Sequence, residues 1–518
     1  MISRDASTIS LWQGNIDPFQ PTLTADHNAT YDVVIVGGGI TGLTTALLLQ
    51  EAGKRCLLLE AANIGFGTTG GTTAHLNTIL DTSYDQIEKN FDKESAGLVR
   101  ESVGAAIGLI QQNVERFSID CGFNYTDAYL FAQHEKQAEA LDIIAKATRE
   151  AGVNITMQDQ LPAAIPFAKA YKITDQASFN PLPYIYGLAH AFEKAGGVIV
   201  QDCRVIEIHN TQHIKVDTSI GEFTGMNIVY ATHIPPGINL LHLRCTPYRS
   251  YAIAVRLADN AYPNALLYDM HEPYHYYRTQ VVNGKKYLVV GGEDHKTGHV
   301  ENTDQCFRNL EALVREQFNV KSVDYKWSSQ FYESADGLPY IGYMPGQPDN
   351  VYVATGFGGN GMVYSGVAAM VIRNIIVGKH RATEKLFDPN RIKPIAGFTN
   401  FLTHNADVVK LFFGKLFPAY KLMELAELAP GQAQVVSYEG HRVAMYKDES
   451  GKLHAVNPVC THLKCEVSWN MAEKSWDCPC HGARYDVDGR VLNTPADRDL
   501  EHLDISHDTS KVEAHEHI

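Results

Sequence analysis

Short apolar runs that alternate with glycine-rich turns predict most elements in the first three-quarters of the chain. Residues 33–36 form a run of β-branched side chains, and residues 37–42 after it are mostly glycine. Residues 43–51 are typical of a helix, and residues 54–59 are typical of a second strand, which ends at Glu60. This succession of strand, tight turn, helix and strand predicts one βαβ unit.

Other segments predict two further groups of strands and a second strand–helix unit. Alternating apolar and polar positions predict strands at residues 197–200, 204–208 and 227–232. A second group, which predicts a mixed sheet, lies at residues 251–257, 274–279 and 286–291. Residues 351–354 predict a strand that leads into another glycine-rich segment and a helix of small residues.

The first glycine-rich turn carries the spacing Gly-x-Gly-x-x-Gly. In such a turn Gly37 makes the bend, Gly39 lets the backbone approach a pyrophosphate, and Gly42 permits close packing of the helix. Glu60 follows the second strand, where a carboxylate can accept a hydrogen bond from a ribose hydroxyl. A tight turn without a ligand is the alternative, but the complete unit favours a bound dinucleotide.

Two other segments are suited to a flavin. Residues 65–75 are small and rich in hydroxyl groups, so they could pass beneath a flavin and bond its phosphates and ring edge; the candidates are Thr68, Thr69, Thr72 and Thr73. The second glycine-rich segment begins a helix, whose first backbone amides can face a flavin ring edge. Its candidates are Gly356, Gly358, Gly359, Asn360, Gly361 and Met362.

Near the C-terminus, a Cys-x-His pair and a Cys-x-x-His pair have the spacing of a Rieske-type [2Fe–2S] centre. We expect Cys460 and Cys478 to bind one iron through thiolates, and His462 and His481 to bind the other through imidazoles. A zinc ribbon with the same four ligands is the alternative. Zinc would leave two further cysteines of this segment without a role.

Composition and charge narrow the class of function. A chain of 518 residues can build two or three domains. Its net charge of −15 argues against a nucleic-acid partner, which would require a basic surface. No apolar run reaches the roughly 18 residues of a transmembrane helix. The N-terminus lacks the apolar core of a signal peptide, so we expect a cytoplasmic protein.

Residues 30–385 are similar to the flavin-dependent amine and amino-acid oxidases of the D-amino-acid oxidase and sarcosine oxidase superfamily. The segments that carry this resemblance are 37–42, Glu60, 67–73, 246–249, 336–342 and 356–361. The whole chain resembles the bacterial FAD-dependent oxidoreductases that are fused to a Rieske domain.

The resemblance implies two cofactors, FAD rather than NAD and a [2Fe–2S] cluster. Gln330 stands where some relatives carry a flavin-linked cysteine, so non-covalent FAD is implied. The position of Val205 matches the place where such folds contact adenine through the backbone. In Rieske domains of the disulfide-bearing kind, two cysteines bridge the cluster-binding loops, and here these would be Cys465 and Cys480.

An α/β (α+β) architecture in three parts follows from the resemblance. Residues 1–385 would form the oxidoreductase domain, with a Rossmann-like FAD part at 30–100, 170–245 and 330–385 and a mixed-sheet substrate part at 100–170 and 245–330. Residues 386–430 would form a linker. Residues 431–518 would form an all-β Rieske [2Fe–2S] domain.

The expected substrate class depends on the absence of a cationic side chain that could bind a carboxylate. Oxidases of small amino acids in this superfamily hold the substrate carboxylate with Arg or Lys, but the corresponding positions here are Ala74, Asn77 and Val363. Residues 327–332, before the Asp-Gly-x-Pro turn, contain no Arg either. A bidentate Arg is the natural partner of a carboxylate, so its absence favours an amine-like substrate.

We therefore expect a dehydrogenase that oxidises a C–N bond by hydride transfer to FAD. Its electrons would leave one at a time through the cluster to an acceptor protein or carrier. An NAD(P)H-dependent reductase that serves a partner oxygenase is the alternative, although the chain contains a single Gly-x-Gly-x-x-Gly motif.

The candidate catalytic residues are Tyr277, His75 and His295. Tyr277 best matches the active-site Tyr of the sarcosine-oxidase pattern, and alternate residues of its strand should face a cavity. His295 could act as a base, with a solvated loop position as the alternative. Further pocket candidates, which could instead fill the space between sheets, are Tyr248, Arg249, Tyr276 and Arg278.

Overall fold

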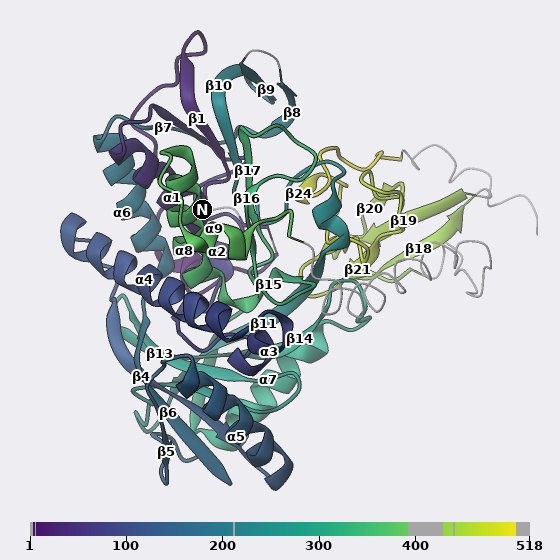
Figure 1. Ribbon diagram of the computed structural model, residues 1–518. Coiled ribbons are helices and arrows are strands. Elements are labelled where there is room, and N and C mark those ends of the chain that lie inside the picture. Colours follow the sequence, from purple (N-terminus) through teal and green to yellow (C-terminus); the bar gives the residue numbers. More distant parts are fainter. Residues whose placement is uncertain (1–3, 6, 211–212, 392–427, 439–440, 504–518) are drawn as a thin grey trace, which may run out of the picture.

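The computed structural model describes residues 4–5, 7–210, 213–391, 428–438 and 441–503. Residues 392–427, most of the predicted linker 386–430, lie outside this part of the chain. Two large sheets lie one above the other, and a smaller all-β domain lies beside them (Figure 1). None of the described helices is long and apolar enough to cross a membrane.

The first sheet contains the predicted βαβ unit. Its strands, in spatial order, are β16 (Tyr340–Tyr343), β17 (Val351–Thr355), β10 (Gly221–Tyr230), β1 (Thr30–Val36), β2 (Cys56–Leu59) and β7 (Val198–Val200). All of these except β16 run parallel, and the antiparallel β8 (Val205–Asn210) and β9 (Ile214–Thr218) extend β10. Val33, Val34 and Ile35 have no exposed surface, as expected when both faces of a parallel sheet are covered.

Helices cover the first sheet and place its loops. Helix α1 (Ile40–Glu51) begins directly after the glycine-rich turn and packs against α8 (Gly361–Ile376). Both helices therefore direct their N-termini toward the same side of the sheet. The other helices of this region are α2 (Thr68–Gly71), α3 (Tyr84–Asn90), α4 (Lys93–Phe117), α6 (Pro181–Lys194) and α9 (Ala382–Phe387).

The second sheet is mixed, as predicted. Its strands, in spatial order, are β15 (Val320–Ser334), β11 (Cys245–Leu257), β14 (Lys285–Lys296), β13 (Tyr276–Val282), β12 (Leu266–Asp269), β4 (Asn124–Ala132), β6 (Lys169–Ser178) and β3 (His75–Leu76). Strand β5 (Ile155–Gln158) pairs with β6. Helix α7 (Asp304–Gln317) packs on β11, β14 and β15, and α5 (Glu135–Glu150) packs on β4 and β5.

Two elements do not follow the predicted division into FAD and substrate parts. Strand β6 was expected in the FAD part, at 170–245, but it pairs with β4 in the second sheet. Helix α4 lies largely within 100–170, expected in the substrate part, but it packs on α8. There a Cβ added to Gly366 would lie 2.8 Å from the Cβ of Ala106. By their contacts, β6 belongs with the second sheet and α4 belongs with the helices of the first sheet, so both lie on the other side of the expected boundaries.

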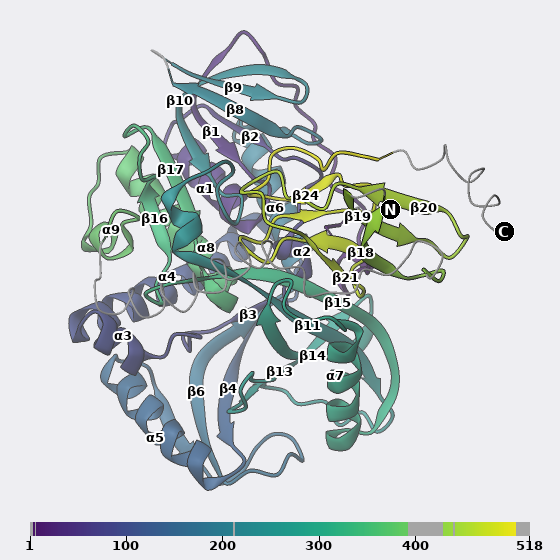
Figure 2. The ribbon, with the colours of Figure 1, turned by 90° about the vertical axis from the view of Figure 1, so that its right-hand side faces the viewer.

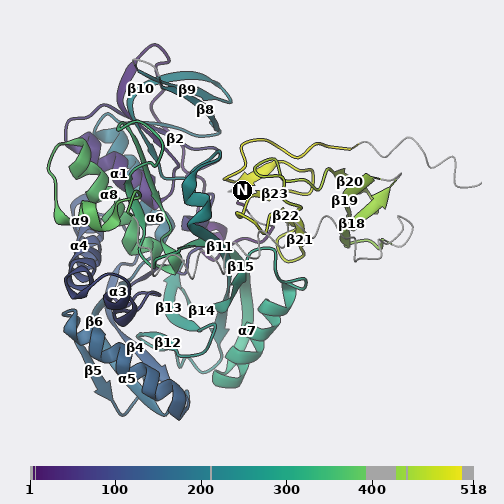
Figure 3. The ribbon, with the colours of Figure 1, turned by 45° about the vertical axis from the view of Figure 1, so that its right-hand side comes forward.

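The C-terminal domain is all-β and contains two small antiparallel sheets. One has β18 (Ala433–Tyr438), β19 (His441–Lys447) and β20 (Leu453–Val456); the other has β21 (Ser468–Asn470), β22 (Ser475–Asp477), β23 (Arg484–Tyr485) and β24 (Val491–Asn493). The four-stranded sheet lies nearer the large sheets than the three-stranded sheet does (Figure 3). In the view of Figure 2, the C-terminal domain lies at a level between the two large sheets.

Buried charges join the C-terminal domain to the rest of the chain. Arg484 donates to Asp477 Oδ1 and to Asp5 Oδ2, both at 3.1 Å. Arg249, on β11, lies 3.7 Å from Asp477 Oδ2 and 4.0 Å from Glu473 Oε1. Although burial opposes the shift, the two guanidinium groups hold the pKa of Asp477 below its usual value. Arg249, a pocket candidate, therefore belongs to the contact between domains.

Replacement of Arg484 by Met should destabilise this contact, because the buried carboxylates of Asp5 and Asp477 would lose the guanidinium group that bonds both of them. Loss of one member of a buried ion pair costs about 3–5 kcal/mol. Arg256→Met is the matched control, since its ion pair with Asp324 is partly exposed and is expected to contribute about 0–1 kcal/mol. Chemical unfolding monitored by tryptophan fluorescence should show a lower midpoint for Arg484→Met, and equal midpoints in the two variants would contradict this prediction.

Candidate functional site

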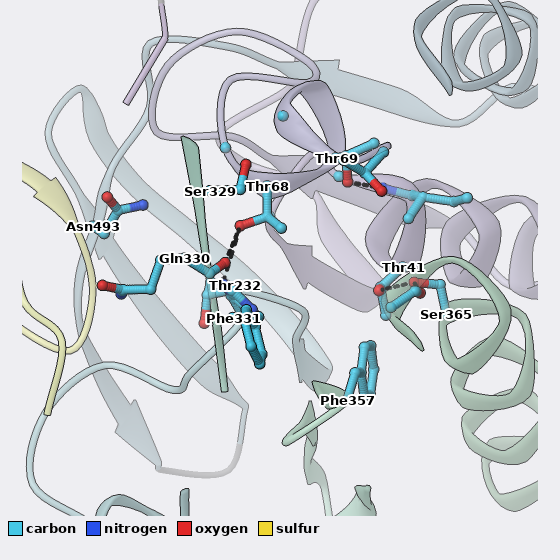
Figure 4. A pocket seen from close by; sticks show the side chains of 18 of the residues that line it. Thr41, Thr68, Thr69, Thr232, Ser329, Gln330, Phe331, Phe357, Ser365 and Asn493 are labelled. Carbon is cyan, nitrogen blue, oxygen red and sulfur yellow. Dashed lines mark hydrogen bonds between the residues drawn. The ribbon is translucent and has the colours of Figure 1, made fainter. Parts of the chain in front are cut away.

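One long cavity of about 280 Å³ extends between both large sheets and the C-terminal domain. Its walls include the glycine-rich turn after β1, the hydroxyl-rich segment 65–73, the loop before α8, and residues 492–497. Thr41 and Ser365 lie on one side, and Gln330 and Asn493 lie on the other (Figure 4). Most of the predicted cofactor-binding residues line this cavity, namely Gly37, Gly39, Glu60, Thr68, Thr69, Thr72, Thr73, Val205, Gly358, Gly359, Asn360, Gly361 and Met362.

The glycine-rich turn has the shape that a pyrophosphate needs. Gly37 has a φ of +112°, which favours glycine. A Cβ added to Gly42 would lie 1.9 Å from Gly37 O, so Gly42 permits the helix to start directly against the turn. Thr69 Oγ1 accepts the amide of Ile40 at 3.1 Å, which fixes the segment 65–73 over the start of α1. Gly42 and Gly356 do not line the cavity themselves; they shape its walls.

Glu60 and Val205 lie together at one end of the cavity. Glu60 accepts the amides of Gly38 at 2.6 Å and Ala62 at 2.9 Å, so the carboxylate is fixed beside the turn. Arg204 lies next to Val205 and donates to Val491 O at 3.0 Å. This end has the donors and acceptors that the adenosine part of a dinucleotide requires.

Aromatic side chains line the other end. The rings of Tyr268 and Tyr276 each lie 5.5 Å from the ring of His75, and Tyr274 lies 5.7 Å from Tyr276. Burial and the nearby Arg278 hold the pKa of His75 well below its usual value, so this imidazole is neutral. Its Nε2 atom is buried without a hydrogen-bond partner in the protein. His75 is thus the one predicted catalytic residue that lines the cavity.

Tyr277 and His295 lie on the opposite face of the second sheet, which corrects their assignment to the cavity. Tyr277 is fully buried in a hydrophobic cluster on that face. His295 Nε2 pairs with the Tyr251 hydroxyl at 2.9 Å, in the same region. Successive side chains of a strand point to opposite faces. The residues that face the cavity are therefore their neighbours Tyr276 and Asp294.

Arg278 and Tyr248 have structural contacts. The Arg278 guanidinium donates to the carbonyls of Thr73, Ala74 and Phe179 at 2.6–3.0 Å, and it also bonds Gln280. It therefore holds the hydroxyl-rich segment against the second sheet. Tyr248 stacks on Phe331, at a ring distance of 5.7 Å, and does not line the cavity.

The four predicted cluster ligands meet in the C-terminal domain. The thiols of Cys460 and Cys478 contact each other, and the rings of His462 and His481 lie 5.1 Å apart. The Nδ1 atoms of both histidines are buried without a hydrogen-bond partner. Burial lowers the pKa of each imidazole, which favours the neutral form that binds iron. Two free thiols and two free imidazole nitrogens fit a cluster ligated at both ends.

Cys465 and Cys480 form a disulfide bond. The sulfur atoms of Cys465, Cys478 and Cys480 lie within 4.8 Å of one another, but the two bridged sulfurs cannot act as thiolates. Cys478 is therefore the ligand of this group. The other thiol ligand, Cys460, has a neighbour on β23. The Tyr485 hydroxyl lies 3.2 Å from Cys460 Sγ, so it can donate a hydrogen bond to that ligand.

The imidazole end of the cluster site faces the oxidoreductase domain. His462 Nε2 lies 3.2 Å from the carbonyl of Gly237, and its ring contacts that of His242 at 4.6 Å. Gln330 Nε2 donates to Gly482 O, beside His481, at 2.8 Å. The carbonyl of the same Gln330 accepts from Thr68 in the cavity at 3.0 Å (Figure 4). One residue thus joins the cavity wall to the cluster-binding loop.

Comparison with known proteins agrees with both sites. A family model described as FAD dependent oxidoreductase matches residues 32–375, and one described as Rieske [2Fe-2S] domain matches residues 418–504. The chain belongs to the FAD-dependent oxidoreductase family. A Bacillus subtilis (strain 168) protein, putative Rieske 2Fe-2S iron-sulfur protein YhfW, is 34% identical over 95% of this chain and 97% of its own.

More distant relatives resemble the oxidoreductase domain. The gamma-glutamylputrescine oxidoreductase of Escherichia coli (strain K12) is 25% identical over 72% of this chain and 89% of its own. Glycine oxidase from Geobacillus kaustophilus has a TM-score of 0.60 at 20% identity, and it covers 70% of this chain and 99% of its own. L-proline dehydrogenase from P. horikoshii has a TM-score of 0.59 at 16% identity, covering 70% and 97%. These two structures show the shared fold.

The comparisons confirm the predicted fold class and both cofactors. The chain is an FAD-dependent oxidoreductase with a C-terminal Rieske [2Fe–2S] domain, so the zinc alternative is excluded. Sequence reasoning missed Asp294, His242 and the wall residues 492–497. Asp294 directly precedes the chosen His295, and His242 lies in a segment without a motif. The wall residues come from a domain that no sequence pattern linked to the cavity.

Gly42→Ala should abolish FAD binding, because the new Cβ would overlap Gly37 O and push the start of α1 away from the pyrophosphate site. Gly97→Ala in α4 is the matched control, since nothing lies within 4 Å of its Cβ. The ratio of flavin to protein absorbance after purification measures the effect. Cluster absorbance should persist in both variants, and normal flavin content in Gly42→Ala would contradict the prediction.

Tyr485→Phe should lower the reduction potential of the cluster. A hydrogen bond to Cys460 Sγ stabilises the more negative, reduced state, and a difference of about 1 kcal/mol corresponds to about 40 mV. Tyr446→Phe is the control, because Tyr446 belongs to the same hydrophobic cluster and stacks on Trp469 instead. Redox titration monitored by EPR gives both potentials. Equal potentials for the two variants would show that the hydroxyl does not act on the cluster.

Proposed function

We propose that the protein is a dehydrogenase that oxidises an amine-like substrate at a C–N bond. When bound, FAD supplies the hydride acceptor and the Rieske cluster supplies a one-electron outlet. Gln330 carries this proposal, because its carbonyl accepts from Thr68 in the cavity while its amide donates to Gly482 of the cluster loop. A direct link of this kind suits a cluster that serves the flavin of the same chain.

The charges of the cavity support an amine over an amino acid. Arg204 is the single Arg among the described lining residues, which include no Lys, and it lies at the end that contains Glu60 and Val205. Arg278 is buried and does not line the cavity, and its two terminal nitrogens donate to backbone carbonyls and to Gln280. The aromatic end of the cavity thus presents no guanidinium or ammonium group to a carboxylate. The relative named gamma-glutamylputrescine oxidoreductase agrees with amine chemistry.

The residues of the chain have defined tasks in this reaction. The amine must be neutral to lose hydride, and hydride loss leaves a cation. A neutral His75 adds no positive charge that would disfavour this cation. Tyr268 and Tyr276 exclude water from the aromatic end, and α8 directs its first amides into the cavity. Because the C-terminal domain closes one wall with Asn493 and Thr494, the reduced site lies beside its outlet. A separate carrier or protein would then collect electrons from the cluster.

Anaerobic mixing of the holoenzyme with a panel of amines, NADH and NADPH tests this function. We expect an amine to bleach the flavin absorbance, and the EPR signal of the reduced cluster to appear in the same sample. Gln330→Leu should delay the cluster signal relative to flavin bleaching, because the link to Gly482 is lost. Rapid bleaching by NADH or NADPH, with none by any amine, would instead identify a reductase.

A further inference from the structure

A carboxylate with one unpartnered oxygen lines the aromatic end of the cavity. Asp294, near the end of β14, lines the cavity, and its Oδ1 atom is buried without a hydrogen-bond partner. Ser250 on the neighbouring β11 acts on the same carboxyl group and lowers its pKa, against the effect of burial. A buried, half-satisfied carboxylate is costly unless a ligand supplies the missing donor. Asp294 therefore has the properties of a ligand-binding group.

Asp81 and Glu333 lie close to Asp294 and make this end acidic, whereas His275, which also acts on Asp294, is paired with Asp269 and Glu293. Asp81 bonds the Tyr274 hydroxyl at 2.9 Å and the amide of Gly359 at 2.6 Å, directly behind the cavity wall. Burial raises the pKa of Asp294 to about 7, and the charge of Asp81 adds to the shift. Burial likewise raises the pKa of Glu333 to about 7, with contributions from Asp81 and Asp294. The charge of Asp81 thus raises the pKa of both Asp294 and Glu333, and a bound cation would relieve this repulsion.

Tyrosine rings complete the surroundings of the carboxylate. Tyr268, Tyr274 and Tyr276 all line the cavity, with successive ring distances of 6.5 and 5.7 Å. Aromatic faces attract ammonium groups, most strongly where water is excluded. His75 contacts two of these rings and is neutral, so it does not compete for the acid. The cavity thus combines an acid with an aromatic cage.

From this geometry we infer that the substrate is an amine with a second group that stays cationic when bound, such as the ammonium group of a diamine, and that Asp294 binds this second group. The inference deepens the proposed function and depends on it for the reacting group. The cation bound by Asp294 differs from the reacting nitrogen, because a carboxylate stabilises an ammonium ion whereas hydride transfer requires the neutral amine. Residues 327–332 agree with this charge preference, because they contain no Arg and Phe331 among them lines the cavity.

Equilibrium binding to the oxidised holoenzyme tests the inference without turnover. Three ligands of similar length differ at one end only: butane-1,4-diamine is cationic, pentan-1-amine is apolar, and 4-aminobutanoate is anionic. Titration by the change in flavin absorbance, under anaerobic conditions and on the alkaline side of neutrality, gives each Kd. We expect the diamine to bind at least about tenfold more tightly than pentan-1-amine, and 4-aminobutanoate to bind most weakly.

Asp294→Asn keeps the shape of the side chain and removes its charge. The diamine Kd should rise by about tenfold, while the Kd of pentan-1-amine should change by less than about twofold. Asp259→Asn, at an exposed position, is the control and should alter neither value. Equal weakening of both amines by Asp294→Asn would place the acid at the reacting nitrogen and overturn the inference. Absence of a diamine preference in the unmodified protein would overturn it as well.

The proposed function fails by a different result. If the diamine binds preferentially but no amine bleaches the flavin, the cation site stands and the dehydrogenase activity is wrong. If amines bleach the flavin without regard to a second charge, the dehydrogenase activity stands and the cation site is wrong. Circular dichroism and flavin content of Asp294→Asn, compared with the unmodified protein, show that the variant is folded and loaded.

Discussion

The arginine–carboxylate contacts between the Rieske domain and the oxidoreductase domain fix the relative position of the two cofactor sites. Arg249 and Arg484 reach Asp477 from opposite domains, and all three side chains are buried. Taking such charges out of water is expensive, so the contact is strong only while each charge keeps its partners. A domain held in this way keeps the cluster loop against Gln330, which a freely moving domain would not do.

The same docking determines which part of the cluster site is accessible. His462 and His481 form the imidazole end of the site, and the oxidoreductase domain covers both of them through Gly237, His242 and Tyr332. Under the proposed function, this end would receive electrons from the flavin side of the same chain. An external acceptor would then have to contact another surface of the Rieske domain while the docking persists, so that the input and the outlet of the cluster would be separated in space.

Local motifs predicted a dinucleotide and an iron–sulfur cluster, and the family resemblance implied that the dinucleotide is FAD, whereas contacts between distant segments could not be predicted. The spacing from Gly37 to Gly42 and the pairing of Cys460 with His462 each define a site within a few residues. Arg249 looks like any strand residue until Asp477, more than two hundred residues later, is placed beside it. The wall formed by residues 492–497 likewise depends on how two domains dock. Docking geometry leaves no local signal in the sequence.

The sequence also could not predict which face of each strand points into the cavity. Tyr277 and His295 were chosen from the correct strands, but Tyr276 and Asp294 face the cavity. A shift of one residue exchanges the two faces of a strand. In this sheet both faces are buried, so the alternation of apolar and polar residues that normally identifies the outer face is weak. Only the pairing of β13 and β14 with their neighbours shows which residues face the cavity. That pairing replaces the expected base, His295, by the acid beside it, Asp294, to which we assign the binding of a cation.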